Sequence, residues 1–131
     1  MAEPTFHLSI VTPERVVLET EARSVVLPAY DGQLGILAHR APLLARLGAG
    51  RLTVETASGE EVYFVDGGFA QMVDNRLTVL TEQARRPEDL DRAAARQALE
   101  AALALPATDE TAQTAKARAI ASARARLRLA P

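Results

Sequence analysis

Most of the information about the fold lies in two neighbouring stretches: Asp31-Gly32-Gln33-Leu34-Gly35-Ile36-Leu37-Ala38-His39-Arg40-Ala41-Pro42-Leu43-Leu44 and Leu47-Gly48-Ala49-Gly50-Arg51-Leu52-Thr53-Val54. Four glycines and one proline interrupt short apolar runs in these stretches. Glycine supplies positive φ and proline fixes φ at about −65°, so both residues favour turns. The pattern is therefore typical of short β-strands joined by tight turns.

The same pattern continues on both sides of these stretches. Phe6, Leu8 and Ile10 alternate with polar residues, as in a strand with one buried face. The continuous apolar runs 16–18 and 25–27 predict strands that are buried on both sides. Many short strands at close spacing indicate an antiparallel β-sandwich. We assign it to a domain over residues 1–84.

Turn residues separate the later strands of this domain. Ser58-Gly59 and Asp74-Asn75 are predicted to be hairpin turns, because Gly, Asn and Asp tolerate positive φ. Asp66-Gly67-Gly68 is expected to break a strand, and its glycines are interpreted as a backbone bend or bulge. Phe69 and Met72, which follow this break, are expected in the core.

The composition changes near Pro87, after which the chain contains no glycine and is rich in alanine and arginine. Alanine has the highest helix propensity, so residues 85–131 are expected to form a helical domain. Pro87 and two carboxylates open a first helix, predicted over 88–105. Pro106 ends it, and Thr108 or Asp109 caps a second helix over 110–129. The short connection predicts an antiparallel hairpin.

The two predicted helices carry little apolar surface. Helical spacing places one stripe on the first helix at Leu90, Ala94, Gln97, Ala98, Ala101 and Leu105, and one on the second at Ala112, Ala119, Ile120, Ala123 and Leu127. Burial of alanine contributes far less than the roughly 1.5–3 kcal/mol of a leucine. We therefore expect the hairpin to be weakly held on the sandwich.

The overall composition excludes several classes of protein. The 131 residues are 48 % hydrophobic, which is enough for a core, and the formal net charge of −2 argues against a nucleic-acid-binding protein. Cysteine is absent, which excludes disulfides and thiolate metal sites. No apolar run has the roughly 18–20 residues of a membrane span, and no targeting peptide is visible. We expect a soluble cytoplasmic protein.

No group of residues suggests an active site. The two histidines, His7 and His39, have no partner at a metal-ligand spacing, and His7 falls on the polar face of a strand. The segment from Gly32 to Gly35 is not followed by a helix, so it does not predict a phosphate-binding loop. The sequence thus predicts a non-catalytic protein without catalytic or metal-binding residues and without a cofactor.

The quoted stretches match the pattern G-x-L-G-I-L-x-x-x-A-P-L-L-x-x-L-x-x-G-x-L-x-V, and the match extends to residues 65–69 and 75–80. In residue type and spacing the chain resembles the epsilon subunit of F-type ATP synthases over almost its whole length. This resemblance implies a non-catalytic rotor subunit whose sandwich binds the gamma subunit and the c-ring, and whose helical hairpin can extend toward the catalytic alpha/beta subunits. Because no transit peptide is visible, we expect a bacterial member that is peripheral to the cytoplasmic face of the plasma membrane through the complex alone.

By this resemblance, particular residues are expected at the contacts. The c-ring and gamma interface would include Gln33, His39, Arg40 and Pro42. Here Gln33 and Arg40 replace a carboxylate and a histidine that are frequent in the family. The basic second helix would restrain ATP hydrolysis by contact with beta, through Arg118, Arg124, Arg126 and Arg128.

Some bacterial epsilon subunits bind ATP through a motif I/L-D-x-x-R-A. In the ungapped register Leu90 and Asp91 match, Arg92 follows, and Ala94 stands at the position of the motif arginine. Without that arginine we expect no ATP binding that could sense cellular ATP.

The sequence also allows two functions from other classes of protein. A β-sandwich enzyme or sugar-binding module would need an aromatic-lined pocket, but aromatic residues make up only 4 % of the chain and tryptophan is absent. A free-standing regulatory adaptor could use the basic helix to bind an acidic partner other than ATP synthase. Copurification with gamma distinguishes the adaptor from the epsilon reading.

Overall fold

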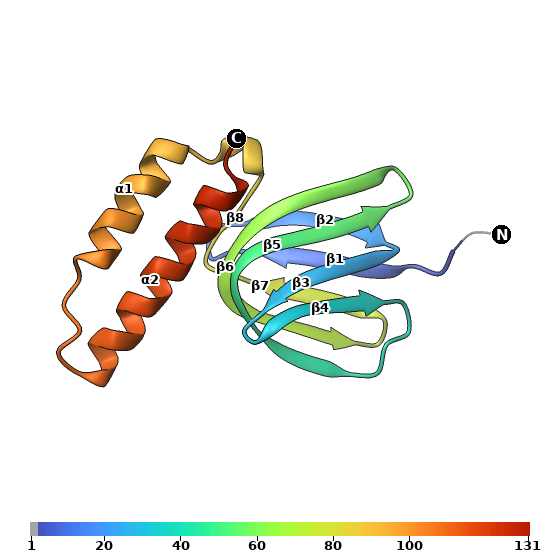
Figure 1. The fold of residues 1–131 in the computed structure, drawn as a ribbon. Coiled ribbons are helices and arrows are strands. Elements are labelled where there is room, and N and C mark those ends of the chain that lie inside the picture. Colours follow the sequence, from blue (N-terminus) through green and yellow to red (C-terminus); the bar gives the residue numbers. More distant parts are fainter. Residues whose placement is uncertain (1–2) are drawn as a thin grey trace.

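The computed structural model describes residues 3–131 as a β-sandwich with a two-helix hairpin at one end (Figure 1). The predicted fold class is confirmed. The elements in chain order are β1 Phe6–Val11, β2 Val16–Ala22, β3 Ser24–Ala29, β4 Gly32–Leu37, β5 Leu43–Thr56, β6 Gly59–Val73, β7 Arg76–Leu80, β8 Ala84–Arg85, a 3-10 turn η1 Pro87–Asp89, α1 Arg92–Leu103 and α2 Glu110–Leu129.

The strands form one sheet in the order β2-β1-β7-β6-β5-β3-β4, and β8 pairs with β6. The long strands β5 and β6 curve, so the sheet closes over itself as a sandwich (Figure 1). All neighbouring strands are antiparallel except β1 and β7, which run parallel. Strand β8 continues the sheet across the predicted boundary between residues 84 and 85, and that boundary stays a prediction.

The core consists of the inward-facing residues of the alternating strands. The fully buried side chains include Phe6, Leu8, Ile10, Val25, Leu27, Leu52, Val54, Met72, Leu77 and Val79. The expectation that runs 16–18 and 25–27 are buried on both sides was wrong. β2 is an edge strand whose Val16 is 53 % exposed, and in β3 Val26 is only partly buried. In an antiparallel sheet only one face needs cover, so an apolar run can reach the outside.

The turn and bend predictions can be compared directly with the backbone. Asp74 and Asn75 have φ of 51° and 60°, which confirms the hairpin turn. Gly67 and Gly68 have φ of 73° and 100°, which confirms a bend. β6 is continuous through them, so the expected break was wrong, and Leu47 still lies opposite Gly68 in register. The bend therefore changes the direction of β6 without slipping the strand.

The first helix begins later than predicted. Residues 87–89 form only a 3-10 turn, and Leu90 is extended. Asp91 is the N-cap of α1, because its carboxylate accepts hydrogen bonds from the N–H groups of Ala93 and Ala94. α1 ends at Leu103 rather than at residue 105. The second helix has the predicted bounds, with Asp109 as its N-cap.

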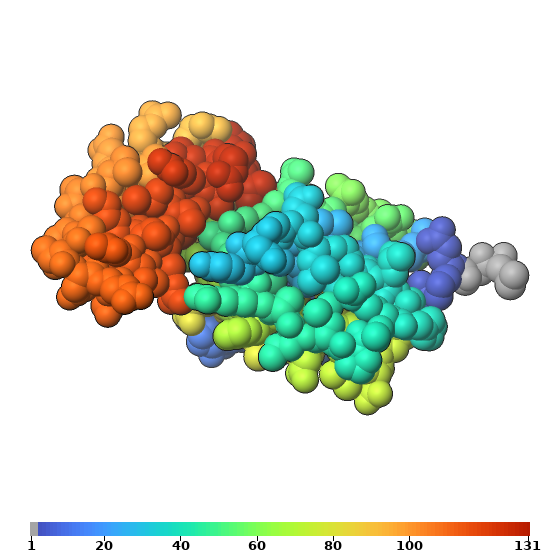
Figure 2. Space-filling view, turned by 60° about the horizontal axis from the view of Figure 1, so that its bottom comes forward, coloured from blue at the N-terminus to red at the C-terminus, as the bar shows by residue number. Residues whose placement is uncertain are grey.

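The hairpin lies against the end of the sandwich that is opposite to the N-terminal side of the chain (Figure 1). α2 packs on β5 and β6, whereas α1 packs on α2. Figure 2 shows that the helices cover only this end and leave much of the sandwich uncovered. Neither helix combines the length and the apolarity that a membrane span requires.

Of the stripe predicted for the first helix, Leu90 is buried and Ala98 is partly buried, but the other four positions are exposed. The buried residues of α1 itself are Ala95 and Ala102, which were not predicted. Of the predicted α2 positions, Ala123 is fully buried and the other four are partly buried. Ser122 and Ala125 are also buried and were not predicted. Both helices consist mainly of alanine and polar residues, so the spacing of their few large apolar residues does not identify the face that packs on the sandwich.

Candidate interaction surfaces

The two histidines lie on the surface of the sandwich, on different elements. His7 is on the outer face of β1, where Nδ1 lies 3.3 Å from Glu21 Oε1 and Nε2 lies 3.3 Å from Ser9 Oγ. His39 is exposed in the β4–β5 connection with φ of 63°. Among residues 3–131 no three His, Cys, Asp or Glu side chains are arranged to hold a metal ion.

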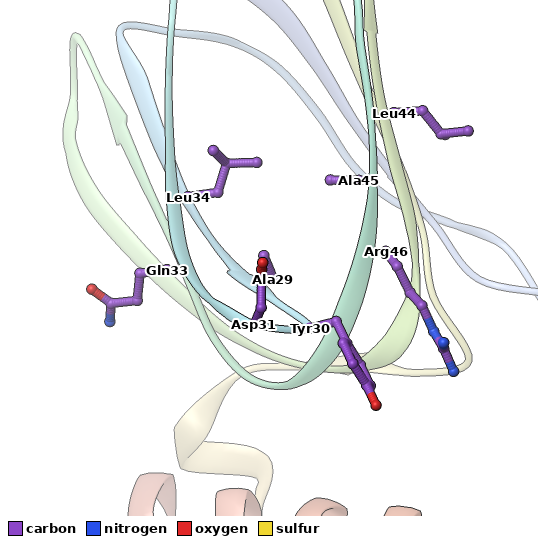
Figure 3. A pocket seen from close by; sticks show the side chains of 8 residues that line it. All are labelled: Ala29, Tyr30, Asp31, Gln33, Leu34, Leu44, Ala45 and Arg46. Atoms are coloured by element: carbon purple, nitrogen blue, oxygen red, sulfur yellow. The ribbon is translucent and has the colours of Figure 1, made fainter.

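One recess of about 380 Å³ lies at the β3–β4 hairpin, on the side of the helices (Figure 3). Its lining includes Tyr30, Asp31, Gln33, Leu44 and Arg46. The guanidinium of Arg46 stacks over the Tyr30 ring at 4.6 Å from the centroid. The recess is open and shallow, and this stacked pair forms part of its wall rather than a set of converging reactive groups.

The predicted c-ring residues are not brought together. His39, Arg40 and Pro42 are exposed in the connection between β4 and β5, at the end of the sandwich away from the helices (Figure 1). Gln33 lies at the opposite end of β4, beside the recess (Figure 3). The four residues were expected at one interface, but a six-residue strand that spans roughly 20 Å separates Gln33 from the other three.

Asn75 fixes the end of the sandwich that carries His39. Its Oδ1 accepts a hydrogen bond from the backbone N–H of His39 at 2.8 Å, and its Nδ2 donates to the carbonyl oxygen of Thr5 at 2.9 Å. The β6–β7 turn, the β4–β5 connection and the start of β1 are thereby joined. From the sequence Asn75 was recognised only as a turn residue, because no local pattern reports a contact across 36 positions.

The outer face of the sheet carries an exposed row of apolar side chains, which we call the outer apolar row. Directly paired residues share a face, and the register joins Val16 to Val11, Val11 to Leu80, and Leu80 to Phe69. Phe69, Leu80 and Val16 are 51 %, 52 % and 53 % exposed. Arg46 continues the row on β5.

The expectation that Phe69 belongs to the core was wrong. Met72 is fully buried, as expected. The two residues are three positions apart in a strand, so their side chains point to opposite faces. Alternation of side chains along the strand could have revealed this from the sequence. Ala70 and Met72 face inward, so Phe69 must face outward.

The basic residues of α2 differ in their surroundings. Arg118, Arg124 and Arg128 are exposed, whereas Arg126 is partly buried and its Nε donates to the carbonyl oxygen of Ser122. Lys116 is partly buried as well. Within residues 3–131 no carboxylate lies at ion-pair distance from any of these five side chains. In the described part of the chain, α2 therefore carries basic side chains that have no acidic partner.

The residues of the degenerate ATP motif hold the hairpin itself. Leu90 is buried against Phe64, and Asp91 caps α1. The guanidinium of Arg92 donates to the carbonyl oxygens of Ala130 and Pro131 at 3.2 and 3.3 Å. Each side chain that matches the start of the motif thus already has an intramolecular partner.

Arg86 ties the connection that leads into the helices to the sandwich. Its Nη1 lies 3.2 Å from Glu61 Oε1 and its Nε lies 3.3 Å from Glu88 Oε1, the latter without hydrogen-bond geometry. A hydrogen bond to the Tyr63 hydroxyl is the main cause of an Arg86 pKa above its ordinary value, and the charge of Glu88 and the hydrogen bond to Glu61 act in the same direction. Arg86 therefore stays charged, and its contacts with Glu61 and Tyr63 hold the segment between β8 and η1 against β6.

Comparison with known proteins gives consistent matches. The family model of the ATP synthase Delta/Epsilon chain β-sandwich domain matches residues 5–87. The ATP synthase epsilon chain of Rhodopirellula baltica is 45 % identical over 119 residues, which cover 91 % of this chain and 93 % of the relative. That of Nitratidesulfovibrio vulgaris strain Miyazaki F is 44 % identical over 96 residues, 73 % of this chain and 72 % of the relative.

A solved structure shares the fold. A chain of the Euglena gracilis mitochondrial ATP synthase, in a structure of OSCP, F1 and the c-ring, superposes with a TM-score of 0.78 at 24 % identity, over 95 % of this chain and 81 % of that chain. The family model spans more than half of the chain, and the Rhodopirellula relative is matched over nearly its whole length. The chain therefore belongs to the family of ATP synthase epsilon chains.

Proposed function

We propose that this chain is a non-catalytic subunit of the central stalk, or rotor, of a proton-translocating F-type ATP synthase. It couples rotation to ATP synthesis and restrains ATP hydrolysis through its C-terminal helices. The sandwich, residues 1–84, is the assembly module and residues 85–131 are the regulatory module. The observation that carries the proposal is the exposed outer apolar row on the sandwich of a member of the epsilon-chain family.

The outer apolar row is the proposed docking site for gamma. Phe69 and Leu80 are cross-strand partners with about half of each side chain in contact with solvent. A row of large apolar side chains across four strands is unusual on a surface that stays free, and aromatic anchors dominate binding energy in interfaces. Arg46 at the end of the row adds a residue type that is enriched in interfaces.

The β4–β5 connection is the proposed contact with the c-ring. His39, Arg40 and Pro42 are exposed there, and the hydrogen bond from His39 to Asn75 keeps the connection in one conformation. A rigid loop loses little entropy on binding, which favours its use as a contact. Gln33 is at the other end of β4, so we leave it out of this contact and attach it to the gamma side of the interface.

The exposed arginines of α2 are the proposed contact with the catalytic alpha/beta subunits. Arg118, Arg124 and Arg128 have no acidic partner in the described part of this chain, so an acidic surface of beta could pair with them. Arg126 is partly buried, and its Nε donates to the carbonyl oxygen of Ser122 one turn earlier in α2, so it is the least accessible of the four arginines for a contact with beta. No cofactor is required for this mechanism.

The bacterial origin of the related epsilon chains supports a place at the cytoplasmic face of a bacterial plasma membrane. The chain would be held there through the complex alone.

The proposal is tested by truncation after Pro87, where the family model ends. Residues 1–87 should still bind gamma and support ATP synthesis, while the complex should hydrolyse ATP faster than the complex with the full chain. Failure of residues 1–87 to bind gamma would refute the assembly role. An unchanged rate of hydrolysis would refute the restraint by the helices.

A further inference from the structure

We infer that Asp66 is a latch that holds the helical hairpin on the sandwich, with Ser122 of α2 as its partner. The Oγ of Ser122 donates to Asp66 Oδ2 at 3.0 Å, across 56 positions of sequence. This contact deepens the proposed function, on which its regulatory meaning rests, since a hairpin that restrains hydrolysis must be able to leave the sandwich.

The polar contact matters because the apolar part of this interface is small. The buried cluster between the modules contains Phe64, Leu90, Ala125 and Ala130, and only Phe64 and Leu90 have large side chains. Leu90 precedes α1 and Ala130 follows α2, so α2 itself contributes to this cluster only Ala125 and the partly buried Leu129. Alanine buries little area, and a hydrogen bond to a carboxylate then supplies a large share of the docking free energy.

Ser122 is unusual within its helix. The buried residues of α2 are Ser122, Ala123 and Ala125, so Ser122 alone carries a polar side chain. It is 8 % exposed. A hydroxyl group that is removed from water needs a partner, and in the docked hairpin Asp66 is that partner.

The fold positions Asp66 for this contact. Its backbone N–H donates to Thr81 Oγ1 at 3.0 Å, and its Oδ2 also accepts a hydrogen bond from Gln83 Nε2 at 3.2 Å. The bend at Gly67 and Gly68 follows at once and brings the end of β7 against β6. Of the three buried polar side chains in residues 3–131, two, those of Thr81 and Ser122, belong to this network.

Asp66 makes its contacts in the latch without a basic partner in the described part of the chain. Within residues 3–131 no Lys, Arg or His side chain lies at ion-pair distance from Asp66. The carboxylate is therefore held by two neutral donors, one on the sandwich and one on the hairpin. Loss of Ser122 would leave Asp66 bound to Gln83, so the sandwich keeps its own network when the hairpin leaves.

The test measures how often the interface opens in the full chain. The sequence has no cysteine, so Ala125→Cys introduces a single thiol at a position that is fully buried in one cluster with Phe64 and Leu90. When redocking is faster than labelling, the rate of modification by a thiol reagent is proportional to the undocked fraction. In this background Ser122→Ala and Asp66→Ala should raise the labelling rate about five- to tenfold.

Two control variants separate the latch from general effects. Thr114→Ala removes an exposed hydroxyl from the same helix and raises helix propensity equally, so it should leave the rate unchanged. Asp66→Asn keeps an acceptor but loses the charge, so it should raise the rate less than Asp66→Ala. If Ser122→Ala and Asp66→Ala label at the rate of Thr114→Ala, the latch is refuted.

Hydrolysis by the assembled complex then separates the latch from the proposed function. Faster labelling together with faster hydrolysis in Ser122→Ala supports both. Faster labelling with no change in hydrolysis, in Ser122→Ala and after removal of the helices, supports the latch and refutes the restraint. Unchanged labelling with faster hydrolysis after removal of the helices refutes the latch alone.

Discussion

Asn75 holds His39 in place: the Asn75 Oδ1 accepts the backbone N–H of His39 at 2.8 Å, and the same side chain donates to the carbonyl oxygen of Thr5. His39 is kept in the left-handed region, at φ of 63°, by a residue that itself has φ of 60°. The proposed c-ring contact is therefore shaped by a turn that lies outside it.

Asn75→Gly should release this connection. Glycine accepts the positive φ of the turn but provides no amide, so both hydrogen bonds are lost. We expect the free energy of unfolding to fall by about 1–3 kcal/mol, and the amide of His39 to exchange faster with solvent. Denaturant unfolding and hydrogen exchange measure the two effects. Asp74→Gly is the matched control, since Asp74 has φ of 51° in the same turn; an equal loss in both variants would contradict this role of Asn75.

Phe69→Ala should weaken binding to gamma with little effect on the fold. About half of Phe69 is exposed, so folding buries only part of the ring, whereas a partner could bury the rest. Loss of a central aromatic anchor typically costs 2 kcal/mol or more, which is about a 30-fold loss of affinity. Titration of gamma with the full chain measures it. Glu60→Ala, at the other end of β6, should bind as the native chain does. Unchanged affinity of Phe69→Ala would exclude the outer apolar row as the gamma site.

Gly68→Ala should destabilise the sandwich strongly. A Cβ at this position would overlap the carbonyl oxygen of Leu80 and lie 2.9 Å from Thr81 Cα, at φ of 100°. We expect a loss of more than about 3 kcal/mol in unfolding free energy. Gly67→Ala should cost only about 1–2 kcal/mol, because the nearest atom is 4.0 Å away and φ is 73°. Thermal unfolding of the two variants compares them, and equal losses would contradict the close approach at Gly68.

The turns and the helix ends show which features of the fold could be predicted from the sequence. The β-sandwich, the Asp74-Asn75 turn and the bounds of α2 follow from short-range rules of alternation, positive φ and capping, and the structure confirms them. The start of α1 was misjudged because Pro87 and Asp91 are both acceptable start signals, and only packing of Leu90 on Phe64 selects the later one.

The surfaces were harder to predict than the fold. Gln33 and His39 are close in sequence but stand at opposite ends of a strand, and the glycines around them read equally well as a loop. The parallel pairing of β1 with β7 and the contact between Asp66 and Ser122 join distant segments. Local residue patterns carry no information about such contacts, so a single sequence does not reveal them.

Replacement of the exposed arginines of α2 should accelerate ATP hydrolysis by the complex. Exposed ion pairs contribute about 0.2–1 kcal/mol each, so Arg118, Arg124 and Arg128 together could shift the hairpin population by about 3- to 150-fold. The triple alanine variant is compared with Arg96→Ala, an exposed arginine of α1. Added salt should reduce the difference, since it screens exposed charges. A native rate in the triple variant, when removal of the helices does accelerate hydrolysis, would exclude the charge mechanism.

The full chain should not bind ATP at micromolar concentration. Ala94 stands at the position of the motif arginine, Asp91 caps α1, and Arg92 binds the carbonyl oxygens at the end of α2. Loss of a charged hydrogen-bond donor costs about 1.5–3 kcal/mol, or more than tenfold in affinity. Calorimetric titration with ATP measures this directly, and a micromolar dissociation constant would show that other arginines replace the missing one.

The most direct test of the central claim, that this chain is a central-stalk subunit, is purification through a tagged gamma subunit from solubilised native membranes. The account predicts that the native chain is recovered with gamma, the catalytic alpha and beta subunits and the c-ring, and that Phe69→Ala is recovered in much smaller amount. Recovery of gamma with alpha, beta and the c-ring but without this chain, while the chain is found on an acidic protein outside the synthase, would contradict it.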